Sequence, residues 1–184
     1  MQLTGKEIME EGLVANVVPE AVQQQGVDVR LMEVREFGHM NVDAFVKNLE
    51  FEHMGYIPAQ GKTKLPSSLP KELITHPITG ATGWLFKPGY YEVIFDEGCK
   101  MPNNRVMVLI SRSSLVRCCG FIECGQFDAG FETEHMGCFM YIAEPMFIEQ
   151  HARIAQLRFT KTEPVEAGSM YNGQWQNDKQ RKNQ

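Results

Sequence analysis

The chain has 184 residues, and its hydrophobic content of 43%, charged content of 22% and net charge of −5 are ordinary for a soluble globular protein. We expect a single domain over residues 1–176, followed by a polar, disordered tail over residues 177–184. The net negative charge and the lack of a dense Lys/Arg run before the tail argue against nucleic acid or a membrane surface as a partner. No apolar run is long enough to form a helix that crosses a membrane.

The first half of the chain predicts few regular elements. Thr4 and Glu7 have capping-box spacing, which predicts a short helix over about residues 5–11 that ends at Gly12. Alternation predicts a strand over residues 26–35, and apolar residues on one face predict a helix over residues 41–53. Residues 59–83 are rich in Pro, Gly, Thr and Ser and predict an irregular loop.

The second half predicts a β protein. Short runs rich in β-branched and aromatic residues predict strands over 90–95, 105–110, 138–143 and 152–159, and residues 84–90 read as a strand, a Pro-Gly turn and the start of another strand. We therefore expect a mainly β fold, a distorted β-barrel or jelly roll with one or two short helices.

The cysteines allow two interpretations. Cys118, Cys119 and Cys124, with His135 and Cys138, could in principle bind zinc, but their spacing is not Cys-x-x-Cys, and adjacent cysteines on a strand point to opposite faces. The zinc-deaminase signature is also absent. We interpret the five cysteines as buried, reduced thiols, and their odd number and the lack of an apolar leader predict a cytoplasmic protein.

Two neighbouring motifs carry the chemistry. Arg112, Ser113 and Ser114 offer a guanidinium fork and two hydroxyls, which suit phosphate oxygens. Asp128 stands between glycines in a short turn, where a carboxylate can act as a general base. The same residues could equally form an ordinary ion pair and a turn cap, and the spacing alone leaves both readings open.

Five segments in order resemble the dUTPase / dCTP deaminase superfamily. They are QGVDVR at 25–30, RSSLVR at 112–117, GQFDAGF at 125–131, RIAQL at 153–157 and YNGQWQ at 171–176. The resemblance runs from about residue 3 to residue 176, with a poorly matched stretch near 36–80. It implies a dUTPase-like β fold and a homotrimer, in which one subunit binds the phosphates of the nucleotide and the hairpin of its neighbour binds the nucleobase.

The resemblance also implies residue roles. Asp128 would be the catalytic base, and Asp28 would support Mg²⁺ through water, although a salt bridge to an arginine is an equal alternative for Asp28. The residues implied to bind substrate are Arg112, Ser113, Ser114, Arg117, Cys124, Gly125, Phe127, Phe131, Gln156, Tyr171 and Gln176. Phe131 would pack on deoxyribose, with a core phenylalanine as its alternative. Arg117 could instead be an ordinary surface arginine.

One departure separates the two branches of the superfamily. The deaminases place a Glu ten residues after the hairpin Asp, whereas position 138 here is Cys and no acid occupies residues 135–143. Other features, including the YNGQWQ segment, resemble the deaminase branch, and Glu123 in the hairpin is an acid without a deduced role. The predicted reaction is Mg²⁺-dependent hydrolysis of dUTP to dUMP and pyrophosphate. The alternatives are dCTP deamination, alone or combined with hydrolysis, and a nucleotide-binding regulatory protein.

Overall fold

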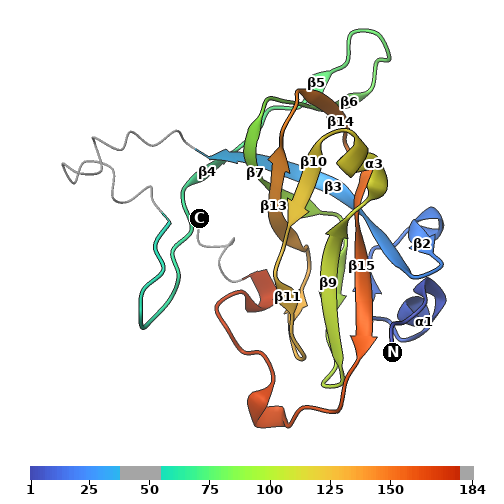
Figure 1. Cartoon of the computed structure of the whole chain (residues 1–184), viewed down its shortest axis with the longest axis vertical. Coiled ribbons are helices and arrows are strands. Elements are labelled where there is room, and N and C mark those ends of the chain that lie inside the picture. The colour runs from blue at the N-terminus through green and yellow to red at the C-terminus, as the bar shows by residue number, and fades with distance from the viewer. Residues whose placement is uncertain (38–54, 179–184) are drawn as a thin grey trace.

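The computed structural model describes residues 1–37 and 55–178, and within them the protein is mainly β (Figure 1). The predicted helix over 41–53 and most of the predicted tail lie outside the described residues. The division into one domain over residues 1–176 stays a prediction. The described part contains no helix with the length and hydropathy needed to span a membrane.

The helices are short and the strands are many. The helices are α1 (Gly5–Glu10), α3 (Ser113–Arg117) and the 3-10 turns η1 (Pro19–Ala21), η3 (Ala167–Ser169) and η4 (Gln176–Asp178). The strands are β1 (Val14–Ala15), β2 (Val22–Gln23), β3 (Gly26–Phe37), β4 (Ser68–Pro70), β5 (Ile74–Thr75), β6 (Thr82–Phe86), β7 (Gly89–Phe95), β8 (Gly98–Lys100), β9 (Arg105–Ser111), β10 (Gly120–Glu123), β11 (Gln126–Phe127), β12 (Glu132–Thr133), β13 (Gly137–Ile142), β14 (Met146–Glu149) and β15 (Arg153–Lys161).

Most predicted elements are confirmed. The capping box at α1 is formed, because Glu7 N donates to Thr4 Oγ1 at 3.2 Å and Thr4 N donates to Glu7 Oε2 at 2.8 Å. The predicted strands correspond to β3, β6, β7, β9, β13 and β15. The region predicted as a loop over 59–83 also contains β4, β5 and the start of β6. Helix α3 was not predicted, since its five residues give too short a pattern to show helical periodicity.

The main sheet is curled so that its two edge strands are neighbours in sequence. Its order is β10-β13-β7-β3-β15-β9-β11, and all neighbours pair antiparallel. Between the first and last strands of this path there are just two residues, Cys124 and Gly125. The link can be this short because the sheet rolls up and brings its edges together (Figure 1). We call residues 123–128 the seam.

The concave face of this sheet carries the core. Alternate residues of the strands point inward, as the pleat requires. The largest fully buried side chains are Leu3, Ile8, Leu31, Trp84, Phe86, Phe95, Met107, Met136, Met140, Ile142, Leu157 and Phe159. This matches the barrel or jelly-roll fold predicted from the sequence.

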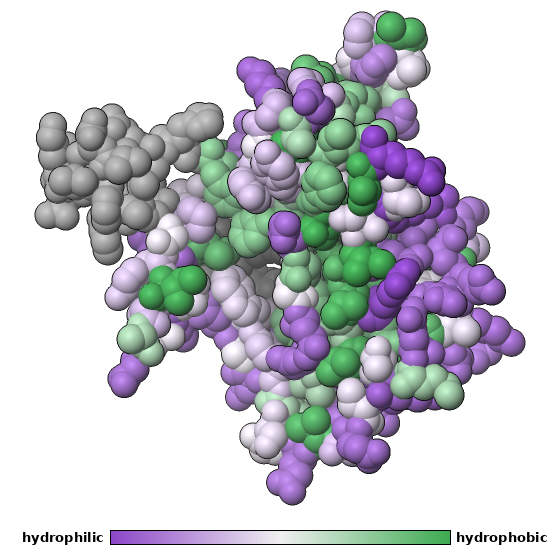
Figure 2. All heavy atoms as spheres, in the orientation of Figure 1, coloured by the Kyte–Doolittle hydropathy of each residue, from purple (hydrophilic) through white to green (hydrophobic). Residues whose placement is uncertain are grey.

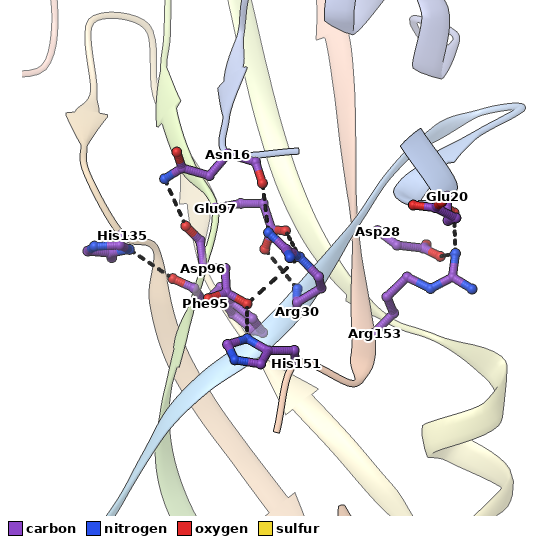
Figure 3. Close-up of polar contacts among 10 residues, drawn as sticks. All are labelled: Asn16, Glu20, Asp28, Arg30, Phe95, Asp96, Glu97, His135, His151 and Arg153. Atoms are coloured by element: carbon purple, nitrogen blue, oxygen red, sulfur yellow. Dashed lines mark hydrogen bonds and ion pairs between the residues drawn. The ribbon is translucent and has the colours of Figure 1, made fainter. Parts of the chain in front are cut away.

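A buried ion pair joins β3 to the turn after β7. The Arg30 guanidinium donates to Glu97 Oε1 at 2.7 Å, and Arg30 N donates to Glu97 Oε2 at 2.8 Å (Figure 3). Glu97 is fully buried, and its burial raises its pKa while Arg30 opposes the shift. Arg30 also donates to Asn16 O at 2.7 Å, and Asp96 accepts from His151 Nδ1 at 2.6 Å beside it. These contacts tie four chain segments together.

We predict that Arg30→Met lowers the free energy of unfolding by about 3–5 kcal/mol, because it leaves the Glu97 carboxylate buried without its partner. Urea unfolding followed by fluorescence measures the loss. Lys6→Met is the matched control: Lys6 pairs with Glu10 on the surface with 84% of its side chain exposed, and its removal should cost less than about 0.5 kcal/mol. Equal losses in the two variants would contradict the prediction.

Candidate functional site

The seam places Asp128 at the end of a tight turn. Phe127 pairs with Met107 of β9, and the chain then turns, with Phe131 N donating to Asp128 O at 3.1 Å. Gly130 has φ +88°, a conformation that favours glycine, so the turn depends on this residue. The Asp128 side chain is exposed and accepts from Gln126 Nε2 at 2.9 Å, which orients the carboxylate.

The C-terminal segment packs against this turn, as the red segment beside β11 in Figure 1 shows. Tyr171 N donates to Ala129 O at 2.8 Å. Gln176 bonds the turn twice: its Nε2 donates to Gly130 O at 3.0 Å, and its Oε1 accepts from Glu132 N at 3.1 Å. Tyr171 and Gln176, which were predicted to bind substrate, therefore lie at the hairpin of their own chain.

A cavity of about 370 Å³ opens beside the seam. Its lining is Leu65, Glu92, Glu123, Cys124, Gly125, Gln126, Phe127, Asp128, Phe131, Thr133, His135, Gly137, Cys138, Phe139, Tyr171 and Trp175. Phe131 stands between two other rings, 5.2 Å from Phe127 and 5.4 Å from Tyr171 by centroids. Burial raises the pKa of the Tyr171 phenol, and the nearby Asp128 carboxylate adds to this shift. The cavity thus offers a flat aromatic wall with a carboxylate at its edge, a shape that suits a planar ring.

Six residues predicted for the site are brought together in this cavity. They are Cys124, Gly125, Phe127, Asp128, Phe131 and Tyr171. Their roles in substrate binding stay predictions. The core alternative for Phe131 is compatible with its 9% exposure, since a ring can line a cavity and pack in the core at once.

Sequence reasoning missed other groups on the cavity wall. Glu92 of β7 pairs with Phe139 of β13, and Phe139 pairs with Glu123 of β10, so the two acids flank one ring on the same face. Glu92 is buried. Its Oε2 accepts a hydrogen bond from Ser68 Oγ at 2.9 Å and forms an ion pair with Arg35 Nε at 3.5 Å. No local signal could have found it, because the register between distant strands decides which residues face each other.

A second group of predicted residues surrounds Asp28. The Asp28 carboxylate is fully buried, and its Oδ2 lies 3.1 Å from Arg112 Nε and 3.6 Å from a terminal guanidinium nitrogen of Arg153. Gln156 Nε2 donates to Asp28 Oδ1 at 3.3 Å. Arg112 also donates to Arg153 O at 3.0 Å. The salt-bridge alternative for Asp28 is thus realised, and the cluster joins β3, β15 and the entry to α3.

The Asp28 carboxylate does not fit a direct magnesium ligand. It is closed off from solvent, and both neighbouring charges are cations, which disfavour a divalent ion beside them. Burial raises the Asp28 pKa and Arg112 opposes the shift. No group of three His, Cys, Asp or Glu side chains that could hold a metal occurs in residues 1–37 and 55–178. Indirect support of a metal by Asp28 stays a prediction.

Helix α3 presents the remaining phosphate-binding candidates. Arg112 is its N-cap, and Leu115 anchors it in the core. Ser113, Ser114 and Arg117 are exposed, so the hydroxyls and the guanidinium are available to a ligand or to another chain. The surface-arginine alternative for Arg117 remains open.

The phosphate-binding candidates and the cavity are separate within one chain. Phe127 of the hairpin lies opposite Met107 of β9. Arg112 follows the end of β9, five residues after Met107, so at about 3.3 Å per residue the two residues of this strand direction are roughly 16 Å apart. Arg112, Ser113 and Ser114 do not line the cavity. The three phosphate-binding candidates of a subunit therefore stand outside that subunit's own cavity.

The cysteines differ from the expectation that all are buried. Cys118 and Cys119 are exposed, because they follow α3 in a turn and not on a strand, and Cys119 has φ +63°. Cys99 and Cys138 are buried, and Cys124 is half-buried. No zinc-type cluster is formed among the residues that the structure describes.

Comparison with protein families identifies the fold group. A family model described as dCTP deaminase-like matches residues 4–162. The chain belongs to this family. The crystal structure of 2′-deoxycytidine 5′-triphosphate deaminase from Agrobacterium tumefaciens is similar with a TM-score of 0.54 and 15% identity, covering 88% of this chain and 47% of that one. At this identity the likeness supports the fold alone.

Two curated relatives of this dCTP deaminase-like protein carry the same name, probable deoxyuridine 5′-triphosphate nucleotidohydrolase. The one from Methanosarcina mazei is 36% identical over 119 residues, covering 62% of this chain and 64% of the relative. The one from Methanosarcina barkeri is 37% identical over 103 residues, covering 54% and 58%. The matched region thus spans less than two thirds of each relative. The predicted superfamily is confirmed.

We predict that Asp28→Asn changes how stability depends on pH. The folded-state pKa of Asp28 is raised above 3.8, so the folded chain keeps this proton to higher pH than the unfolded chain does. The contribution of Asp28 to the unfolding free energy is therefore greatest at low pH and falls as pH rises through the raised pKa. Asn cannot titrate, so the stability of the parent minus that of the variant should decrease as pH rises from 3.8 through the raised pKa of Asp28.

Urea unfolding at several pH values measures this difference. The control is Glu10→Gln, a surface carboxylate with 62% of its side chain exposed, whose replacement should change the free energy of unfolding little because its pair with Lys6 is exposed to solvent. A difference that grows with pH for Asp28→Asn would show that the two arginines outweigh burial.

Proposed function

We propose that the protein is an enzyme that hydrolyses dUTP to dUMP and pyrophosphate with Mg²⁺, as a homotrimer. The observation that carries the proposal is Asp128: it is exposed, oriented by Gln126, and stands at the edge of an aromatic cavity. The names of the Methanosarcina relatives support the same reaction. A cytoplasmic location without nucleic-acid or membrane partners completes the proposal.

Asp128 acts as the general base in this mechanism. Its carboxylate accepts a proton from a water molecule and aims the oxygen at the α-phosphorus, and pyrophosphate leaves as the bridging P–O bond breaks. The hydrogen bond from Gln126 to Oδ1 leaves Oδ2 as the oxygen available for this proton. The uracil ring lies in the cavity, where the backbone of residues 124–127 offers amides and carbonyls to its edge. Phe131 supplies an apolar surface for the sugar and leaves no room for a 2′-hydroxyl.

Magnesium in this proposal binds with the substrate. Mg²⁺ keeps several waters and takes one or two carboxylates plus substrate phosphates, so it needs no preformed cage. The ion neutralises phosphate charge when it is bound. Arg112, Ser113, Ser114 and Arg117 would contact the phosphate oxygens, with Arg112 held in place by Asp28.

The trimer completes the site. The cavity with Asp128 and the phosphate-binding candidates on α3 lie apart in one chain, so a second copy of the chain would bring its α3 to the cavity. Exposed apolar side chains support contact between copies: Val108, Val116 and Phe121 are each about 40% exposed, on β9, α3 and β10. Figure 2 shows hydrophobic side chains gathered over this face, whereas the surface over α1 and β2 is hydrophilic. Such a patch is typical of an interface.

A specific observation keeps dCTP deamination as the second candidate. Cys138 stands where the deaminases carry a Glu, but Glu92 and Glu123 both line the same cavity. Glu92 accepts from Ser68 Oγ at 2.9 Å and lies 3.5 Å from Arg35 Nε, so its carboxylate is held in place by the wall and is not free to move toward a ligand. Glu123 is exposed at the cavity rim. A regulatory protein that binds a nucleotide without turnover is the third alternative.

We predict that Asp128→Asn lowers kcat for dUTP by on the order of 10²–10⁴, because the amide keeps the shape of the side chain but cannot accept a proton. Nucleotide affinity, measured by calorimetry, should change little. Glu132→Gln is the matched control, since Glu132 lies four residues away and pairs with Lys100 at 3.6 Å outside the cavity. Wild-type turnover in Asp128→Asn would assign the base to another residue.

We predict that the protein releases no ammonia from dCTP with Mg²⁺. Position 138 on the cavity wall is occupied by Cys and not by an acid. The buried Cys138 thiol cannot replace a carboxylate as a proton shuttle. A coupled ammonia assay tests this, with dUTP cleavage in the same preparation as the positive control. Ammonia release above the no-enzyme rate that disappears in Glu92→Gln or Glu123→Gln would support the deaminase reading.

We predict that two inactive variants restore activity when mixed. Asp128→Asn removes the base, and Ser114→Glu places a negative charge among the phosphate-binding residues at an exposed position. If each site takes Asp128 from one subunit and Ser114 from the next, mixed trimers contain some intact sites. Unfolding and refolding the variants together should then recover part of the wild-type turnover. Activity no higher than that of the separate variants would place both groups in one subunit.

A further inference from the structure

Two thiols face each other on the wall of the cavity. Strands β10 and β13 pair antiparallel, and their last pair is Glu123 with Phe139, so the next positions, Cys124 and Cys138, lie opposite each other. The two side chains are hydrogen-bonded, and both line the cavity. Opposed residues of antiparallel strands have Cα atoms about 4.5–5.5 Å apart, which is within the range that a disulfide can bridge.

The pair has the chemistry of a reactive dithiol. The Cys138 S–H donates to the Cys124 sulfur, and this bond lowers the pKa of Cys124 more than burial raises it, with help from the Gly125 amide. A lowered pKa increases the fraction of thiolate, which is the form that attacks an oxidant. Cys124 is half-buried and Cys138 is buried, so the thiolate forms on the more accessible partner and the second thiol stands ready beside it.

The other three cysteines lack this arrangement. Cys118 and Cys119 are exposed neighbours in the turn after α3, and Cys99 is buried on β8. None of these three lines the cavity. A small oxidant that enters the cavity therefore meets one opposed pair of thiols.

We propose that Cys124 and Cys138 form a peroxide-sensitive redox site, whose oxidation to a disulfide closes the seam side of the cavity and slows turnover. The effect on turnover rests on the proposed function, whereas disulfide formation does not. In the first step the Cys124 thiolate attacks hydrogen peroxide, the O–O bond breaks, and a sulfenic acid and hydroxide form. In the second step the Cys138 thiol attacks the Cys124 sulfur, and the S–O bond breaks with release of water. In total, two thiols are oxidised and one peroxide is reduced to two waters.

The disulfide alters the site through the seam. Cys124 is one of the two residues that join β10 to β11, and the backbone beyond it leads directly to Phe127 and Asp128. A covalent bond to Cys138 draws this link toward β13 and moves the hairpin relative to the bound base. A displacement of about 1 Å at a reacting geometry can cost on the order of 10²-fold in rate, so oxidation should lower turnover by about that factor.

Peptide mapping tests the bond directly. The protein carrying Cys118→Ser and Cys119→Ser, which removes the exposed thiols, is treated with hydrogen peroxide, unfolded, and alkylated with N-ethylmaleimide. No Lys or Arg lies between Arg117 and Arg153, so trypsin leaves both cysteines in one peptide. A second protease that cleaves after Glu is therefore added, because a cut after Glu132 or Glu134 separates the two cysteines. We expect one alkylated thiol, Cys99, and a disulfide-linked pair of peptides that dithiothreitol releases. Alkylation of both Cys124 and Cys138 after peroxide treatment overturns the proposal.

Turnover gives the second readout. Each protein is compared with its own rate before oxidation. Peroxide should inhibit the Cys118→Ser/Cys119→Ser protein, and dithiothreitol should restore it, whereas the same protein carrying Cys138→Ser should form no internal disulfide and show no dithiothreitol-reversible loss. A mapped disulfide with unchanged turnover overturns the closing of the cavity. If no nucleotide is hydrolysed in any state, the proposed function fails, and the mapping still decides the redox site.

Discussion

The short link between β10 and β11 is the constraint on which the site depends. These strands are the two edges of the main sheet, and two residues join them. A flat sheet would hold its edges several strand widths apart, each about 4.8 Å, so the link requires the sheet to curl. The curl encloses the core, and it also brings the wall of β13 beside the hairpin that carries Asp128. The cavity is therefore a consequence of how the barrel closes.

Buried charge secures the rest of the architecture. Strand β3 carries Asp28 and Arg30 two residues apart, and each forms an ion pair that reaches another part of the chain. Removing charges from water costs several kcal/mol per ion, so such pairs persist where hydrogen bonds and geometry compensate. The Arg30 pair holds the turn between β7 and β8, and the Asp28 pair holds Arg112 at the entry to α3. One strand thus positions both a structural turn and the phosphate-binding candidates.

The cavity combines features of two chemistries. The oriented Asp128 and the aromatic wall suit nucleotide hydrolysis, and the family to which the chain belongs is dCTP deaminase-like. Where the deaminase acid is expected, a thiol pair stands instead, and the acids on the same wall come from other strands. At the seam, Cys138 therefore lies opposite Cys124 on the cavity wall.

Local sequence determined the strands, the α1 cap and the motif residues, because alternation and capping act within a few residues. The five motifs also identified the superfamily. Helix α3, the exposure of Cys118, and the presence of Glu92 on the cavity wall were not predictable from the sequence, since each depends on contacts across the barrel. The pairing of Cys124 with Cys138 has the same origin, because strand register, set by long-range packing, decides which distant residues meet.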